Sequence, residues 1–234
     1  MDGIESKYGF VPVIYEDNHL LGVVKPPNLP AQGDLSGDQD LFALLKKYVQ
    51  RKYNKPGNVY LGLVHRLDRP VGGAMVFAKT SKAAARLSEQ FAQHSNGKQY
   101  LAVLEGELEQ ETRMECLLLA KQGQNAVIVK EDVPGAKRAA LVSTPLCVRN
   151  GLTLTLVTLE TGRKHQIRVQ HADAGYPLWG DNRYGNGKRG MQIALWAYKL
   201  TVEHPTLRTP VEMVSLPPQT GIWTEFGDIL EGLK

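Results

Sequence analysis

Cysteine is scarce in this sequence, and long apolar runs are missing from it. Two cysteines occur among 234 residues, Cys116 and Cys147, and neither belongs to a Cys-x-x-Cys or Cys/His spacing. We therefore expect no disulfide framework and no zinc site built on cysteine, and a reducing, cytoplasmic compartment fits. No run approaches about 18 apolar residues and the N-terminus has no apolar core, so neither a membrane span nor a secretion signal is predicted.

The signatures of nucleotide-binding loops are also lacking. No GxxxxGK[ST] pattern occurs, and no glycine-rich loop joins a strand to a helix in a βαβ unit, which argues against a nucleotide cofactor and a Rossmann sheet. His165 and His171 are conceivable zinc ligands, but no glutamate or third ligand accompanies them. We therefore expect neither a nucleotide cofactor nor a metal.

The composition is that of an ordinary globular protein with a mild excess of basic charge. Apolar residues make up 42% of the chain and charged residues 22%, as in most folded domains. Lysine and arginine number 28 against 24 aspartates and glutamates, which gives a net charge of +4. This excess is compatible with a polyanionic partner without requiring one.

Two helices are predicted in the first half of the chain. Apolar residues recur at helical spacing over 41–49, and Asp40 is a plausible N-cap. A second helix is predicted from Thr80 or Ser81 to about residue 94, and Ser-Asn-Gly at 95–97 ends it.

Strand signals dominate the rest of the sequence. The Asn150-Gly151 pair predicts a hairpin, because this pair adopts the tight turn that joins antiparallel strands. The predicted strands cover 13–15, 20–24, 114–119, 126–130, 139–148, 152–159, 193–202 and 211–216.

The stretch at 65–73 reads His-Arg-Leu-Asp-Arg-Pro-Val-Gly-Gly and separates two apolar runs. Proline fixes φ and glycine permits positive φ, so the chain must stop and turn there. Asp68 lies between Arg66 and Arg69, and neighbouring cations hold a carboxylate ionised and attract phosphates. A buried ion pair that only pins the turn explains the same residues, and the residues alone do not choose.

Two further polar side chains stand out, each with an ordinary alternative. Lys25 opens the segment Lys-Pro-Pro-Asn-Leu-Pro at 25–30, which excludes a helix. Its ammonium either contacts a phosphate or is structural, and we favour the structural role. Tyr100 lies in a strand-like run at 98–106, where a core aromatic is the ordinary interpretation.

Basic residues gather at 163–168, directly after the predicted hairpin. Thr161 or Gly162 can begin a helix here, and Gly175 can end it. The exposed N–H groups of its first turn would also favour anions, although a solvated basic face is the ordinary alternative. The basic residues are Arg163, Lys164, His165 and Arg168.

Four segments, in this order, resemble the motifs of the RluA-type pseudouridine synthases, and the resemblance covers roughly residues 12–217. It implies an α+β fold, the pseudouridine synthase fold, in which a mixed, mainly antiparallel sheet has flanking helices. The segments are Val-Lys-Pro-Pro-Asn-Leu at 24–29, His-Arg-Leu-Asp at 65–68, Lys-Gln-Tyr-Leu-Ala-Val-Leu-Glu-Gly at 98–106 and Gly-Arg-Lys-His-Gln-Ile-Arg-Val-Gln at 162–170, and a fifth similar segment is Gly-Tyr-Pro-Leu-Trp-Gly-Asp at 175–181.

The sequence departs from the family pattern at several positions. Asn28 replaces the usual glycine, which is a mild change because asparagine tolerates the left-handed conformation. Gln170 replaces the usual histidine. Pro-Val-Gly at 70–72 replaces the usual residues after the aspartate, and we interpret this as a subgroup trait that alters loop shape rather than chemistry.

The resemblance implies that Asp68 is the catalytic residue of an isomerisation that needs no cofactor or metal. Asp68 either adds to C1′ of uridine or helps to remove the 2′ proton, and the sequence does not choose. Tyr100 would stack on the uracil, and Arg168 would hold Asp68 ionised. Arg66 would fill the space left by the flipped base or bind a phosphate. The candidate RNA contacts are Lys25, His65, Arg69, Arg163, Lys164 and His165.

The expected organisation is an N-terminal tail at 1–11, a catalytic domain at 12–217 and a C-terminal extension at 218–234. Many family members carry a small N-terminal RNA-binding domain, and we expect none in these 234 residues. We expect ribosomal RNA, transfer RNA or both as partner, no membrane or DNA partner, and a monomer.

Two rival functions remain open. A nucleoside or glycoside hydrolase also uses an aspartate at an anomeric carbon, but normally with a second carboxylate as acid. A non-catalytic RNA-binding protein would need neither Asp68 nor Tyr100. The products formed from labelled RNA separate these functions.

Overall fold

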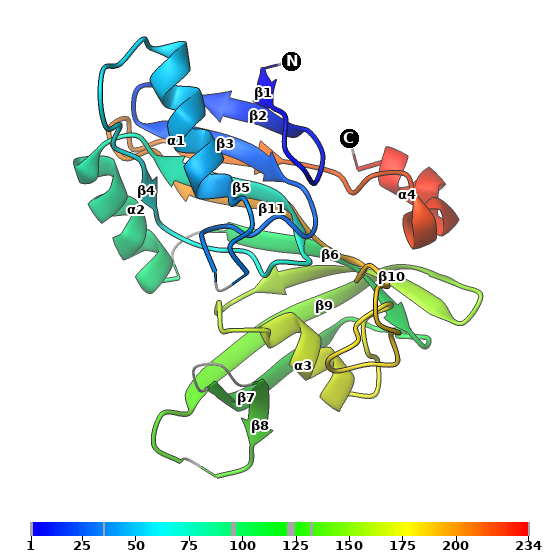
Figure 1. Ribbon diagram of the computed structural model, residues 1–234. Coiled ribbons are helices and arrows are strands. Elements are labelled where there is room, and N and C mark those ends of the chain that lie inside the picture. Colours follow the sequence, from blue (N-terminus) through cyan, green and yellow to red (C-terminus); the bar gives the residue numbers. More distant parts are fainter. Residues whose placement is uncertain (1, 35, 95–96, 121–124, 132, 234) are drawn as a thin grey trace. The chain divides into compact units, whose positions relative to one another are not determined.

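The computed structural model describes residues 2–34, 36–94, 97–120, 125–131 and 133–233, and Figure 1 shows its elements. The chain divides into two compact units. Unit 1 consists of Met1–Gly97 and Ala197–Ser215, and unit 2 of Lys98–Trp196 and Leu216–Lys234. Each unit therefore combines segments that are far apart in the sequence.

Unit 1 is built on a sheet whose strands follow the order β1-β2-β3-β5-β11, with β12 paired to β11 and β4 paired to β5. The pairs β1/β2, β2/β3, β3/β5, β4/β5 and β11/β12 are antiparallel. The strands are β1 (Gly3–Ile4), β2 (Val11–Glu16), β3 (Leu20–Lys25), β4 (Gly62–Leu63), β5 (Gly72–Ala78), β11 (Leu195–Glu203) and β12 (Pro210–Val214).

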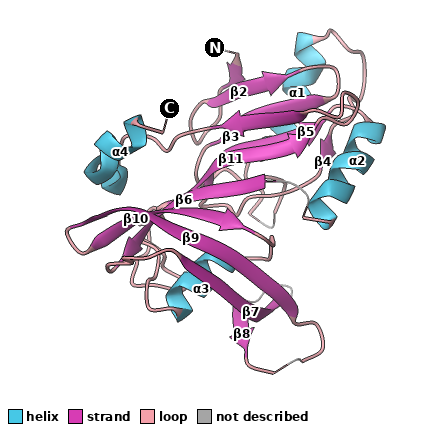
Figure 2. Ribbon diagram, turned by 180° about the vertical axis from the view of Figure 1, so that it is seen from behind, coloured by secondary structure: helices cyan, strands magenta, loops and turns pink. Residues whose placement is uncertain are grey.

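Both helices of unit 1 begin at the residues that the sequence indicated. The Asp40 side chain accepts a hydrogen bond from Ala43 N at 2.9 Å and caps α1 (Leu41–Lys52), and Thr80 caps α2 (Ser81–Ala92) in the same way. Figures 1 and 2 show α1 covering one face of the sheet. The predicted end of the second helix at residues 95–96 lies outside the described residues.

Unit 2 contains a sheet of antiparallel neighbours in the order β6-β10-β9-β7-β8. Figures 1 and 2 show α3 against one face of this sheet. Asn150 and Gly151 both have positive φ, 53° and 72°, and form the predicted hairpin turn. The elements are β6 (Gly97–Glu105), β7 (Thr112–Ala120), β8 (Ala126–Val129), β9 (Lys137–Arg149), β10 (Leu152–Leu159), α3 (Gln166–Asp173), the 3-10 helix η1 (Gly221–Phe226) and α4 (Gly227–Glu231).

The start of α3 corrects the sequence-based expectation. The helix begins at Gln166 rather than at Thr161 or Gly162. Thr161 is tied to β9 instead, because its hydroxyl accepts a hydrogen bond from Ala140 N at 2.9 Å and its own N–H donates to Ala140 O at 3.2 Å. The basic residues at 163–165 therefore precede the helix and do not lie on its first turn.

The expected fold class agrees with the structure. The α+β fold with mainly antiparallel pairing and flanking helices is confirmed. The expected tail at 1–11 is more ordered than its name implies, because β1 pairs with β2. None of the described helices has the length and apolarity needed to cross a membrane.

Candidate active site

The predicted site residues belong to both units, and we describe each group within its own unit. Unit 1 holds Lys25, His65, Arg66, Asp68 and Arg69, whereas unit 2 holds Tyr100, Arg163, Lys164, His165 and Arg168.

Asp68 lies in the loop that joins β4 to β5. Leu67 is buried and anchors this loop, Arg66 is exposed and Asp68 is half-buried. A hydrogen bond of 3.0 Å from Val71 N to Asp68 O closes the turn. Gly73 follows with φ of 119°, and a Cβ there would lie 2.3 Å from Ala197 O, so only glycine fits. The backbone thus presents the Asp68 carboxylate at a fixed turn.

Lys25 fastens this turn to the neighbouring Pro-rich segment. Its side chain is fully buried, and Nζ donates to Leu29 O at 2.8 Å, Arg69 O at 3.0 Å and Pro26 O at 3.1 Å. Burial lowers the pKa of Lys25 to about 7, and attraction to Asp68 opposes this shift. These contacts favour the structural role, because a phosphate contact would require the ammonium to leave its enclosure.

Arg69 and His65 also make firm contacts within unit 1. The Arg69 guanidinium forms ion pairs with Asp34 and Asp38, and these carboxylates raise its pKa. The His65 ring stacks on Phe91 with centroids 4.5 Å apart, and its Nε2 accepts the N–H of Val76 at 3.0 Å. Both contacts favour structural roles for side chains that the sequence proposed as RNA contacts.

Tyr100 lies on β6 in unit 2, opposite Val157 of β10. It is half-buried rather than enclosed, unlike the fully buried Leu101 that follows it. Because side chains alternate along a strand, Lys98 points to the same side of β6 as Tyr100. Lys98 is therefore a basic residue near Tyr100 that the sequence analysis did not single out, although it belongs to the same motif.

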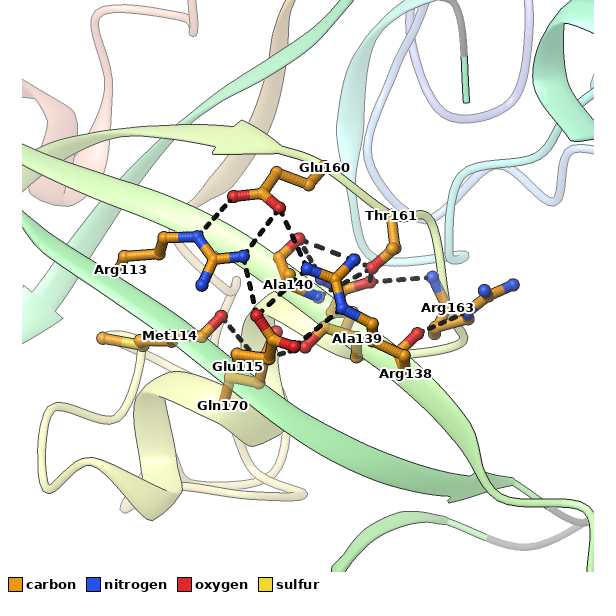
Figure 3. A network of polar contacts seen from close by, with 11 residues as sticks. Arg113, Met114, Glu115, Arg138, Ala139, Ala140, Glu160, Thr161, Arg163 and Gln170 are labelled. Carbon is orange, nitrogen blue, oxygen red and sulfur yellow. Dashed lines mark hydrogen bonds and ion pairs between the residues drawn. The ribbon is translucent and has the colours of Figure 1, made fainter. Parts of the chain in front are cut away.

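The segment at 163–165 joins β10 to α3. Arg163 Nε donates to Arg138 O at 3.0 Å, and Figure 3 shows this contact. Lys164 is exposed. His165 is mostly buried in the left-handed conformation, with φ of 55°, and its Nδ1 lies 2.8 Å from the Tyr184 hydroxyl.

Arg168 forms a buried bidentate ion pair with Asp181, a partner that the sequence analysis missed. Nε and Nη2 of Arg168 lie 2.7 and 2.6 Å from the two carboxylate oxygens. Burial alone would raise the pKa of Asp181, but the bonds and charge of Arg168 lower it overall. The Tyr184 ring also lies under the Arg168 guanidinium, 5.4 Å from centroid to carbon. The sequence did contain one signal for this pair, because Asp181 ends the family-like segment at 175–181 and has the opposite charge to Arg168.

Gln170 and His171, which follow Val169, form hydrogen bonds within unit 2. The side chain of Gln170 donates to Ala139 O at 3.2 Å and Met114 O at 3.3 Å, so it joins α3 to β9 and β7 (Figure 3). Burial lowers the pKa of His171 to about 4, and its two ring nitrogens contact Ile167 O and Ser143 Oγ. Within the described residues, no group of three or more His, Cys, Asp or Glu could hold a metal ion.

A family model described as RNA pseudouridylate synthase matches residues 19–173, which is more than half of the chain. The chain therefore belongs to the RNA pseudouridine synthase family, in agreement with its RluA-type motifs. It is 32% identical to the uncharacterised RNA pseudouridine synthase YhcT of Bacillus subtilis, over 85% of this chain and 66% of the relative. It is also 32% identical to ribosomal large subunit pseudouridine synthase D of Zymomonas mobilis, over 88% and 69%.

Other comparisons agree. The tRNA pseudouridine synthase C of Haemophilus ducreyi is 29% identical over 74% of each chain. The solved structure titled human RNA pseudouridylate synthase domain containing 4 superposes with a TM-score of 0.74 at 21% identity over 88% of each chain, which shows a shared fold. The chain spans about two thirds of the length of the first two curated relatives.

Proposed function

We propose that this protein isomerises specific uridines of ribosomal or transfer RNA to pseudouridine, with Asp68 as the catalytic carboxylate. The observation that carries this proposal is the position of Asp68. Its carboxylate is half-buried on a turn, and the buried Lys25 ammonium binds this turn through Arg69 O. The names of the relatives support the substrate class, since one acts on the ribosomal large subunit and another on tRNA.

The proposed reaction moves one bond and one proton. The N1–C1′ bond of uridine breaks and a C5–C1′ bond forms, while the proton on C5 leaves and N1 takes up a proton. Asp68 either adds to C1′ as a nucleophile or assists loss of the 2′ proton to give a glycal. No oxidant, reductant or metal is required by this balance.

Other side chains support the reaction in this proposal. Tyr100 stacks on the uracil after the nucleotide leaves its base stack, and the exposed Arg66 fills the vacated space or binds a phosphate. Arg168, whose guanidinium Asp181 orients, supports the active site in this proposal through its positive charge. Arg163, Lys164 and His165 contact phosphates of the RNA.

Asp68→Asn tests this function, because the amide keeps the size and polarity of the side chain and removes its charge. Turnover should fall by several orders of magnitude, whereas RNA binding should persist because phosphates supply most of the affinity. Tritium release from RNA labelled at C5 of uridine and the melting temperature are measured on one preparation. The matched control is Asp173→Asn at the exposed end of α3, which should behave like the wild type.

The other outcomes distinguish the rivals. A folded Asp68→Asn protein with near-normal tritium release would contradict the role of Asp68. Free uracil as the product would indicate a hydrolase, and bound but unchanged RNA would indicate a non-catalytic RNA-binding protein.

A further inference from the structure

Gly162 and Lys98 make a close approach in unit 2 that the residue roles above do not explain. A Cβ built on Gly162 would lie 3.1 Å from Lys98 Nζ. The backbone of Gly162 does not occupy the left-handed region, so its conformation does not demand glycine there. What the glycine provides is room for the end of the lysine side chain.

A second cation follows directly. Burial and the neighbouring charge of Arg163 both lower the pKa of Lys98, to about 8. The backbone N–H of Arg163 donates to Gln166 Oε1 at 3.0 Å. The Nε of Arg163 donates to Arg138 O, and this bond orients the Arg163 side chain (Figure 3). Gly162 is exposed and both cations are partly exposed, so an anion from solution can reach them.

We propose that Lys98, whose ammonium lies beside Gly162, and the adjacent Arg163 form a phosphate-binding subsite for the RNA substrate. The proposal rests on the proposed function for the identity of the anion. The charge of Arg163 disfavours the charged form of Lys98, and a phosphate that accepts hydrogen bonds from both side chains offsets this repulsion.

The position of Lys98 indicates which phosphate is bound. Lys98 and Tyr100 point to the same side of β6 and are separated by roughly 7 Å along the strand. If Tyr100 stacks on the target uracil, this spacing assigns the phosphate bound by Lys98 to the target nucleotide or to its neighbour. The subsite therefore positions the target nucleotide rather than reading its sequence.

Lys98→Met and Gly162→Ala test the subsite in two independent ways. Lys98→Met keeps the apolar stem and removes the charge, so the log–log slope of RNA affinity against salt should fall by about 0.7 for single-stranded contact and about 0.9 for duplex. Gly162→Ala leaves every charge in place but brings a methyl group to 3.1 Å from Nζ, which must shift by a few tenths of an ångström, so it should lower affinity and slope by less than Lys98→Met does. Combining the two should add little to Lys98→Met alone.

Lys82→Met, at an exposed lysine of α2, is the matched control and should keep the wild-type slope. Melting curves of all variants verify folding, and Gly162→Ala keeps the test valid if Lys98→Met is unstable. A wild-type slope in folded Lys98→Met, or fully additive effects of the two changes, would overturn the subsite. Pseudouridine formation by the wild type is measured in parallel, so that failure of the proposed function is seen separately.

Discussion

Lys25 in unit 1 and Lys98 in unit 2 both lie in family motifs, and burial lowers the pKa of both, yet their surroundings differ. Lys25 is fully enclosed, and three backbone carbonyl oxygens accept hydrogen bonds from its Nζ. Lys98 is partly exposed, lies beside a glycine and faces the charge of Arg163. The first lysine holds two segments of the chain together, and the second is arranged to receive an anion from outside.

The same contrast separates two sets of ion pairs in unit 2. Arg168 and Asp181 are buried, with side-chain exposures of 6% and 0%. Arg113, Glu115, Arg138 and Glu160 form an exposed ring of ion pairs on β7, β9 and the end of β10, shown in Figure 3. Burial thus decides how much each charge matters to folding, since water screens the ring and not the buried pair.

The largest stability effect is expected from Asp181→Asn. This change removes the negative charge that pairs with the buried Arg168 guanidinium, which should lower the free energy of unfolding by roughly 3–5 kcal/mol. Urea unfolding at neutral pH measures the loss. Asp228→Asn removes one partner of the exposed pair with Arg149 and serves as the control. Equal, small effects at both positions would show that the buried pair contributes no more than an exposed one.

A smaller effect is expected from the titration of Lys25. An unfolded lysine keeps its proton up to a pKa near 10.5, whereas folded Lys25 loses it near 7. Between these values the unfolded state binds more protons, so the free energy of unfolding should rise with pH, by at most about 1.4 kcal/mol per pH unit. Lys98 should contribute in the same direction over the narrower window from about 8.

Urea unfolding at several pH values from about 7 to about 9, roughly two units of this window, checks the rise in the wild type, Lys25→Met and Lys98→Met. The rise with pH should flatten in Lys25→Met and flatten less in Lys98→Met. An undiminished rise in Lys25→Met would mean that Lys25 stays charged in the folded protein and that the comparison between the two lysines fails.

Local signals carried most of the fold prediction, and their success has a physical basis. The strand at 152–159 was predicted to the residue because Asn150-Gly151 fixes the turn before it. Asp40 and Thr80 placed two helix starts because a capping side chain acts within three residues. The start of α3 was misplaced because Thr161 bonds to Ala140, a contact across 21 residues that no local pattern encodes.

Contacts between segments that are distant in the sequence also limited the prediction of the site. The sequence located the Asp68 loop and the basic segment, since both are continuous motifs. It did not find the pairing of Arg168 with Asp181, or the fit of Lys98 beside Gly162, because each depends on two segments meeting in space. RNA contacts of Lys25, His65 and Arg69 stay predictions, and within unit 1 these side chains contact carbonyl groups, Phe91 and carboxylates.

The smallest effect is expected in the exposed ring. Glu160 pairs with Arg113 at 2.7 Å and with Arg138 at 3.4 Å, while the side chains of the ring remain 36–51% exposed. Glu160→Gln should lower the thermal midpoint slightly at low salt and leave it unchanged at about 1 M NaCl, where screening acts within roughly 3 Å. Glu115→Gln should behave alike, because Glu115 also bridges both arginines. A large loss that persists in high salt would place the ring with the buried pair, and the contrast between exposed and enclosed charges in unit 2 would be wrong.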